Sequence, residues 1–449
     1  MNLDLNQELE LEIKRVGING EGIGYFEKKA VFVPEALPNE RVKIKILKIA
    51  DKFSHAELIE VIRPSSERIK PKCSDYSNCG ACQLQHAKNQ GEIKSELLLE
   101  SLCKYSSLAN PKKFVDEIIL SDKSFYYRNK AMMLVRDYNN PLGFYKTGTN
   151  HFISTPNCIL HMKIIGDILK EIPNVIKASK IVCYDERRKK GELMSVLIRC
   201  DQTEEKVMIM VGVSSLEVKL DKFFELLTNK FPVINSIYKT VIDIKDNPYY
   251  GDEIIHVGRE THLDLNFMDY KFRLLPRAFF QLNYLQAEKF YQKIIKLAGV
   301  KKTDIVIDAY AGIGIIGILV SKFVKRVFLN EIDKDCLESA KTTIELNGIT
   351  NITILPGDFV KAINGLDKKT VIDCLFVDPP RSGLIDYTGI LKLRPKRIVY
   401  GSCNTATLSK DIKVLSEFYF VTKIVPLDMF PNTSHVESIL LLNLKSDRK

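Results

Sequence analysis

A cysteine in a tight turn near the C-terminus is the residue with the clearest capacity for chemistry. Cys403 stands in a Gly-Ser-Cys-Asn turn, after the apolar segment 397–400 and before a helix-like segment that begins at Ala406. A strand that ends in a turn before a helix presents that turn at the carboxyl edge of a sheet, where open α/β folds bind ligands. Cys403 is therefore a candidate nucleophile, although a lone cysteine is more often a buried apolar residue.

Three further cysteines lie close together in the first part of the chain. Cys73, Cys79 and Cys82 have the spacing C-x5-C-x2-C in a loop-like stretch with Pro, Gly and Asn. Thiolates at this spacing can converge on one metal centre, and zinc and a [4Fe–4S] cluster each take four ligands. Cys158 is the best candidate for the fourth ligand, and His86 is a possible substitute. The spacing alone leaves zinc and iron–sulfur open.

A glycine-rich loop follows a predicted strand at residues 304–308. Residues 312–317 read G-x-G-x-x-G, and Glu331 ends the next predicted strand. This layout suits a dinucleotide or S-adenosylmethionine, with the acidic residue on the ribose. Asp378 lies further on in an Asp-Pro-Pro-Arg turn. Amino-methyltransferases have an aromatic residue after a similar turn, so Arg381 argues against methylation of an amino group.

The elements that must position these residues fall into three predicted domains. A chain of 449 residues is long enough for about three domains. Residues 1–63 predict a small β-barrel of the oligonucleotide-binding type, and residues 64–275 predict a central α+β domain around the cysteines. Residues 276–449 alternate strand and helix, as in a doubly wound, Rossmann-like sheet. The fold class is therefore α/β plus β.

The predicted barrel has four strands, with a glycine-rich turn at residues 20–24. The strands lie at residues 10–13, 30–34, 41–46 and 56–61. One face of the third strand carries Arg41, Lys43 and Lys45. This row is either a solvated face or a surface for the RNA backbone.

Composition indicates a cytoplasmic protein. Its first residues lack the basic and apolar pattern of a signal peptide, and no apolar run approaches the ~20 residues that span a bilayer. Ten cysteines in a cytoplasmic chain are expected to bind metal, catalyse or be buried. The net charge of +10 is compatible with a polyanionic partner. We expect a monomer.

The N-terminal segment resembles the TRAM domain, a small RNA-binding barrel found in RNA-modifying enzymes. The rest of the chain resembles the TrmA/RumA-type RNA uracil-5 methyltransferases of the iron–sulfur branch. The first resemblance rests on residues 20–24, 31–40 and 63–68. The second rests on residues 73–86, 127–130, 143–145, 280–283, 308–314, 378–383, 402–404 and 428–437. Departures at Ala81, Ala311, Thr405 and Asn432 remove no reacting group.

The resemblance implies a role for each matched residue. It implies a catalytic pair of Cys403 and Glu437, and cluster ligands Cys73, Cys79, Cys82 and Cys158. The implied binding set for S-adenosylmethionine is Gln281, Tyr310, Glu331 and Asp378, with Asp358 as a weaker candidate near the adenine. Arg128 and Lys130 are expected to contact RNA. The combination of barrel and cluster favours ribosomal RNA as the substrate, with transfer RNA as the alternative.

Methylation of uracil C5 needs a thiol and a carboxylate together. C5 becomes nucleophilic only after a thiolate adds to C6, and a base must then remove the C5 proton so that the enzyme is released. Two other classes of protein remain open. A radical S-adenosylmethionine enzyme needs three cysteines, usually as C-x3-C-x2-C, and an RNA-binding iron–sulfur protein without activity would leave Asp378 and Cys403 unexplained.

Overall fold

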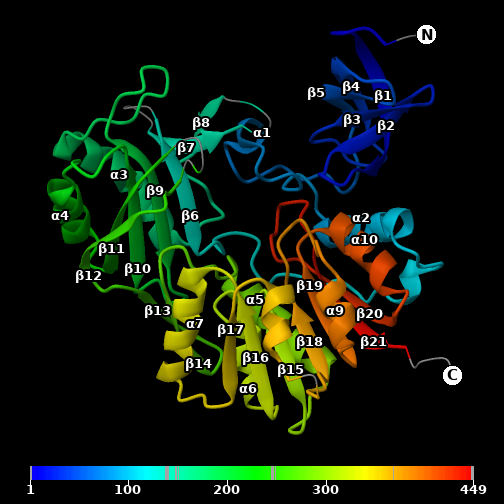
Figure 1. Ribbon diagram of the computed structural model, residues 1–449. Helices are drawn as coiled ribbons and strands as arrows, with labels where there is room; N and C mark the ends of the chain where they lie inside the picture. Colours follow the sequence, from blue (N-terminus) through cyan, green and yellow to red (C-terminus); the bar gives the residue numbers. More distant parts are fainter. Residues whose placement is uncertain are drawn as a thin grey trace.

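The computed structural model describes residues 3–136, 141–146, 149, 151–243, 247, 249–367 and 369–445. It has a small N-terminal barrel and two larger parts, each built around a seven-stranded sheet (Figure 1). Among the described residues, no helix is both long and apolar enough to cross a bilayer.

The barrel closes with the strand order β1-β2-β3-β5-β4. Its strands are β1 (Glu8–Val16), β2 (Gly22–Phe26), β3 (Lys29–Val33), β4 (Arg41–Ile49) and β5 (Phe53–Arg63). β4 alternates between buried Val42, Ile44 and Ile46 and outward-facing cations, which is the pattern that the sequence predicts. The predicted small barrel is therefore confirmed.

Two details of the barrel differ from expectation. The glycine-rich segment was expected to be a turn, but β2 begins at Gly22, because strands approach too closely there for a side chain. A Cβ at Gly24 would lie 2.5 Å from Leu11 Cδ2.

The cations of β4 form cross-strand ion pairs, Arg41 with Glu10, Lys43 with Glu8 and Lys45 with Glu57. That row is a mixed-charge face and not a free cationic surface.

The central sheet has the order β12-β11-β10-β9-β6-β7-β8. β9 and β10 are buried along their whole length and are apolar almost throughout, as expected of inner strands. Helices α3 (Lys163–Ser179) and α4 (Asp221–Lys230) pack together against this sheet. The strands are β6 (Lys130–Val135), β7 (Leu142–Tyr145), β8 (Phe152–Ser154), β9 (Leu193–Cys200), β10 (Val207–Val213), β11 (Ile234–Val241) and β12 (Ile254–Arg259). A separate hairpin follows, β13 (Leu263–Phe267) and β14 (Tyr270–Leu274).

The C-terminal sheet has the order β17-β16-β15-β18-β19-β21-β20. β15 to β19 run parallel, and β21 is antiparallel to β19. Its strands are β15 (Ile305–Ala309), β16 (Arg326–Glu331), β17 (Ile352–Pro356), β18 (Cys374–Val377), β19 (Arg397–Ser402), β20 (Tyr419–Leu427) and β21 (Glu437–Leu444). Its helices are α5 (Tyr284–Ala298), α6 (Ile315–Ser321), α7 (Lys334–Leu346), α8 (Phe359–Ala362), α9 (Thr388–Leu393) and α10 (Thr405–Leu415), with a short 3-10 helix at Ile363–Gly365.

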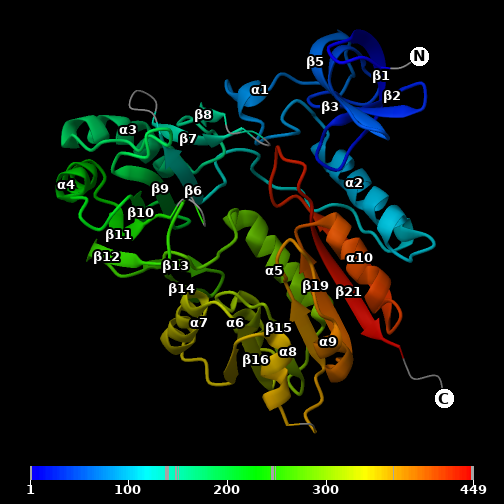
Figure 2. The ribbon, with the colours of Figure 1, turned by 45° about the horizontal axis from the view of Figure 1, so that its top comes forward.

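The segment that follows the cysteine loop packs on the C-terminal sheet. After α1 (Tyr76–Cys79), helix α2 (Gln90–Tyr105) lies along α10, as both views show (Figures 1 and 2). Next to the 3-10 helix Pro111–Lys113, residues 114–119 exchange backbone hydrogen bonds with β20. Lys94 of α2, which is fully buried, forms an ion pair of 2.5 Å with Asp428. Residues 90–119 therefore belong to the core of the C-terminal sheet, although they precede the central domain in the chain.

Candidate active site and cysteine cavity

A cavity of about 560 Å³ lies at the carboxyl edge of the parallel strands. Parallel strands end at the same edge, so residues that follow β15, β18 and β19 meet there. β21 is antiparallel and therefore begins at that edge, which brings Glu437 beside them. The cavity is lined by five of the six residues predicted for catalysis and cofactor binding, namely Gln281, Tyr310, Asp378, Cys403 and Glu437.

Cys403 sits between the end of β19 and the start of α10. The side chain of Asn404 caps α10 by accepting hydrogen bonds from the backbone N–H groups of Ala406 and Thr407, and its amide donates to the Arg381 carbonyl at 3.1 Å. Ser402 pairs with Ser438 across the sheet, so Glu437 is the residue opposite Cys403. The turn that carries the thiol is therefore held on both sides.

The two carboxyl groups beside the thiol have raised pKa values. Burial first, and then the charge of Asp378, raises the pKa of Glu437 well above its ordinary value. Burial also raises the pKa of Asp378 to about 6. Burial is the largest cause that raises the pKa of the Cys403 thiol, and the negative charges of Glu437 and Asp378 raise it further, to about 11. Arg381 opposes this shift, and in the free protein the thiol is neutral at pH 7.

The glycine-rich loop lines another part of the cavity. The Gly312 N–H donates to Glu331 Oε2 at 2.7 Å, and Glu331 Oε1 accepts from the N–H groups of Ile332 and Asp333. Gly312 has φ +57°, and a Cβ there would meet no atom within 4 Å. This loop leaves room for a ligand to approach its backbone, and Glu331 is fixed directly behind it.

Asp358, the weaker candidate for cofactor binding, has a structural role as a helix cap. The carboxylate of Asp358 accepts from the Lys361 N–H at 3.1 Å and caps the short helix α8. Asp358 does not line the cavity.

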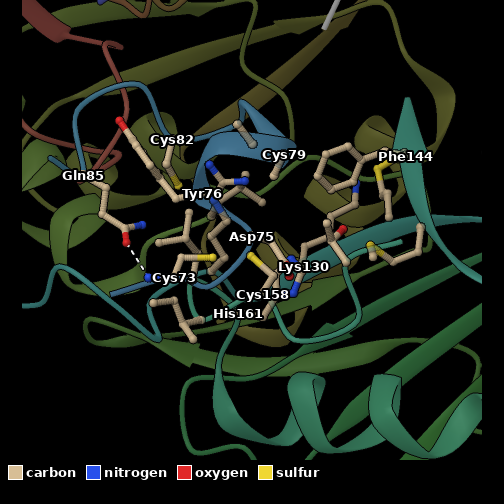
Figure 3. A pocket seen from close by; sticks show the side chains of 18 of the residues that line it. Cys73, Asp75, Tyr76, Cys79, Cys82, Gln85, Lys130, Phe144, Cys158 and His161 are labelled. Atoms are coloured by element: carbon tan, nitrogen blue, oxygen red, sulfur yellow. Dashed lines mark hydrogen bonds between the residues drawn. The ribbon is translucent and has the colours of Figure 1, made fainter. Parts of the chain in front are cut away.

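A second cavity, of about 320 Å³, is lined by four cysteines: Cys73, Cys79, Cys82 and Cys158. Figure 3 shows them around it, with Gln85 accepting from the Cys73 N–H at 2.7 Å. Burial raises the thiol pKa of Cys79 to about 11 and that of Cys82 to about 12, and the other cysteines add to both shifts. The loop, α1 and the chain after β8 therefore bring the four predicted ligands together.

Within the described ranges, no group of three or more His, Cys, Asp or Glu side chains is close enough to bind one metal ion. The cavity that the four cysteines line extends beyond them to apolar residues such as Met132 and Phe144, so its size does not distinguish zinc from a cluster.

Two basic side chains lie beside this cysteine cavity. Lys130 lines it and pairs across β6 and β9 with Arg199, which is 1% exposed. Burial, and then the like charge of Arg199, lowers the pKa of Lys130 to about 7. Neither cation has an ion-pair partner among the residues that the structure describes. Lys130, for which the resemblance implies RNA contact, lines this cavity (Figure 3).

Arg128 connects the two cavities. It lines both of them, together with Phe279 and Leu282. The sequence pointed to Arg128 only through its aromatic and basic neighbours. It gave no role to His435, whose Nδ1 lies 3.2 Å from Arg381 Nη2, or to Tyr291, which lines the cavity from α5. Tyr291 carries no local signal, because an inward-facing aromatic on an amphipathic helix is the ordinary core pattern.

Two family models match the chain. Residues 4–59 match the TRAM domain, and residues 255–445 match the family described as tRNA (Uracil-5-)-methyltransferase. An uncharacterized RNA methyltransferase of Streptococcus pyogenes serotype M3 is 33% identical, with 98% of this chain and 99% of the relative covered. An uncharacterized RNA methyltransferase of Clostridium acetobutylicum is also 33% identical, with 97% of each chain covered.

A solved structure has a similar overall fold. It is the tRNA (uracil-54, C5)-methyltransferase of Pyrococcus abyssi in complex with S-adenosyl-L-homocysteine. The TM-score is 0.77 and the sequences are 23% identical, with 97% of this chain and 100% of that chain covered.

Proposed function

Because the chain belongs to the family of RNA methyltransferases that join a TRAM domain to a tRNA (uracil-5-)-methyltransferase domain, we propose that it methylates C5 of uracil in RNA. The observation that carries this proposal is the meeting of a thiol, a buried carboxyl group and a glycine-rich loop in one cavity. Methylation of uracil C5 requires a nucleophile, a base and a methyl donor at one place.

The order of events follows from the positions of Cys403 and Glu437. The Cys403 thiol loses its proton to solvent, its sulfur forms a bond to C6, and the C5=C6 electron pair moves onto O4 as an enolate. The pair then returns to C5, which would bond to the methyl carbon as the S–CH3 bond of the sulfonium donor breaks and a thioether leaves. Glu437 takes the proton from C5, the C5=C6 bond forms again, and the C6–S bond breaks to release the thiolate. A carboxylate with a raised pKa is a stronger base than a solvated one, which suits Glu437 to this task.

We propose that the loop side of the cavity binds S-adenosylmethionine, which supplies the electrophilic methyl group. The residues assigned to it are Gln281, Tyr310, Glu331 and Asp378. Two observations support the fit: the space over Gly312 is open, and the Glu331 carboxylate is fixed by three backbone N–H groups. A carboxylate at Asp378 also favours a sulfonium cation nearby.

Gly401→Ala is expected to weaken binding of S-adenosylhomocysteine about tenfold. The added Cβ would lie 3.0 Å from Asp378 Oδ1 and 2.9 Å from Phe290 Cζ, so the carboxylate has to move away. Isothermal titration calorimetry measures the change. Gly166→Ala is the matched control, because its Cβ meets open space on α3. Equal affinity in Gly401→Ala and the wild type would contradict the placement of Asp378 in the cofactor site.

We propose ribosomal RNA as the substrate, on the resemblance of the barrel and cysteine loop, with transfer RNA as the second candidate. The name of the matching family and the Pyrococcus abyssi enzyme favour the second. The test is incubation with labelled S-adenosylmethionine and transcripts of each RNA, followed by digestion to nucleosides. Label in 5-methyluridine identifies the reaction, and the labelled transcript identifies the substrate. Label in another nucleoside would overturn the proposal.

We further propose that the four cysteines hold a [4Fe–4S] cluster. Such a cluster with four thiolates is anionic, and the partly buried basic side chains of Lys130 and Arg128 line the same cavity. An anionic group in this cavity would offset the positive charge on these side chains, which supports the assignment. Methyl transfer needs no electron, and we assign the cluster a structural role.

Cys82→Ser is expected to remove iron from the protein. Anaerobically purified wild-type protein should hold about four iron and four sulfide ions per chain, and the variant less than half of that. Chemical iron and sulfide assays measure both. Cys103→Ser is the control, since Cys103 is exposed on α2, outside this cavity. Zinc without iron in the wild-type protein would refute the cluster.

A further inference from the structure

The connection between α3 and β9 carries four consecutive cations on its surface. Arg187, Arg188, Lys189 and Lys190 are all exposed, in a short turn that follows Asp185 and Glu186. Charge runs of this kind are most often solvated, and a fixed backbone shape together with unpaired charge distinguishes a binding site from such a run.

The turn is held in one shape. Asp185 Oδ1 accepts hydrogen bonds from the backbone N–H groups of Arg187 and Arg188 at 2.9 and 3.2 Å. The backbones of Asp185 and Lys190 also pair with each other. Gly191 closes the turn with φ +123°, and a Cβ there would lie 2.4 Å from the Cys183 carbonyl oxygen. Only glycine fits that position, so the backbone geometry is fixed locally.

The base of the turn is anchored to the central sheet. Arg136, whose side chain is 8% exposed, donates to Glu186 at 3.1 Å, to the Tyr145 hydroxyl at 3.2 Å and to the Met194 carbonyl at 3.0 Å. The Tyr145 hydroxyl also donates to Glu186. Because these bonds occupy the Glu186 carboxylate at the base of the turn, that carboxylate is not available to neutralise the cations at its tip.

Most of the charge at the tip is unneutralised. Arg188 has an ion pair with Asp185 at 3.6 Å, and its side chain is 82% exposed. Arg187, Lys189 and Lys190 have no ion-pair partner among the residues that the structure describes. The row Arg41, Lys43 and Lys45 of the barrel differs, because each of its cations faces a glutamate.

The anchor lies on the strand that borders the cysteine cavity. Tyr145 ends β7, and its neighbour Phe144 lines the cysteine cavity, which shares Arg128, Phe279 and Leu282 with the candidate active site.

We propose that residues 187–190 form a preorganised binding site for the phosphate backbone of the substrate RNA. Arginine and lysine in a fixed turn bind phosphate groups without base specificity, which adds affinity and orientation rather than sequence recognition. An RNA partner is favoured over an acidic protein because the family acts on RNA. The inference rests on RNA as the substrate, and it holds whichever uridine is methylated.

The test compares the salt dependence of RNA binding. The variant Arg187→Gln, Arg188→Gln, Lys189→Asn, Lys190→Gln removes four charges and keeps the turn, since asparagine tolerates φ +52° at position 189. The probe is a 30-nucleotide single-stranded RNA of mixed sequence, and the dissociation constant is measured by fluorescence anisotropy from 50 to 200 mM salt. When the logarithm of the dissociation constant is plotted against the logarithm of the salt concentration, each lost phosphate contact on single-stranded RNA lowers the slope by about 0.7.

The expected slope decreases by about 3, so the wild type loses about 60-fold more affinity than the variant over this range. The control replaces four exposed lysines at the opposite, amino edge of the C-terminal sheet by glutamine: Lys301, Lys302, Lys325 and Lys369. A decrease of at least about 1.5 in the turn variant, with the control unchanged, supports the proposal. A smaller decrease in the slope, or an equal decrease in the control, overturns the proposal. The turn would then bind an acidic protein or face only solvent. Binding is measured without methyl transfer, so failure of the proposed reaction would be seen separately.

Discussion

Cys403→Ala is expected to abolish methyl transfer and the covalent complex with RNA that contains 5-fluorouridine. Fluorine at C5 cannot be removed by a base, so an enzyme that adds a thiolate to C6 and transfers the methyl group remains bound to the RNA. The wild type should give an adduct resistant to denaturing gel electrophoresis, and the variant none. Loss of the nucleophile should lower turnover by at least about 10⁴-fold. An adduct that persists in Cys403→Ala would exclude the covalent mechanism with Cys403 as the nucleophile.

The pH dependence of the same adduct provides a second measurement. The pKa of the Cys403 thiol is raised to about 11, so only a small fraction is thiolate at pH 7. A raised pKa means that the reactive form increases with pH until the pKa is reached. The rate of adduct formation should therefore rise about tenfold per pH unit between pH 7 and 9. A flat profile over that range would show that another group limits the reaction.

Glu437→Gln is expected to stop the reaction after methyl transfer. The thiol can still add to C6 and C5 can still take the methyl group, but the C5 proton has no acceptor. RNA with ordinary uridine should then accumulate as a labelled covalent complex, and turnover should fall by about 10²–10⁴-fold. Denaturing gels after incubation with labelled S-adenosylmethionine measure the complex.

Two comparisons make this result specific. Glu437→Asp keeps the carboxylate and should restore part of the turnover, while Asp386→Asn, at an exposed carboxyl group, should behave as the wild type. Normal turnover in Glu437→Gln, or loss of function without any trapped complex, would exclude Glu437 as the base that releases the product.

The sequence was most informative where chemistry needs particular residue types at the ends of strands. Asp378 and Cys403 follow apolar strands, and parallel strands bring such residues together, so their meeting in one cavity was predictable. The four cysteines were predictable because a loop offers no core in which thiols could simply be buried. In the barrel, the alternation of apolar and polar residues predicted four of the strands. It did not predict β2, because Gly22 and Gly24 look like turn residues.

The features of the site that the sequence does not predict depend on contacts between segments far apart in the chain. Arg128 lines two cavities only because the chain after β8 and the segment before α5 fold beside it. The pairing of Lys130 with Arg199 is a matter of strand register, which alternation within one strand does not determine. The basic turn at 187–190 is visible as a charge run, but its fixed shape comes from Arg136 and Gly191.

The packing of residues 90–119 on the C-terminal sheet bears on how the protein can be divided. β20 is an edge strand, and residues 114–119 occupy part of its outer side, with Ile424 donating to the Phe114 carbonyl at 2.7 Å. A fragment that starts at residue 276 would keep every proposed catalytic residue yet expose that edge and the apolar face of α10. Uncovered edges of this kind pair with other chains and aggregate. The smallest soluble catalytic fragment therefore has to include the helix and edge segment that the chain supplies before its central domain.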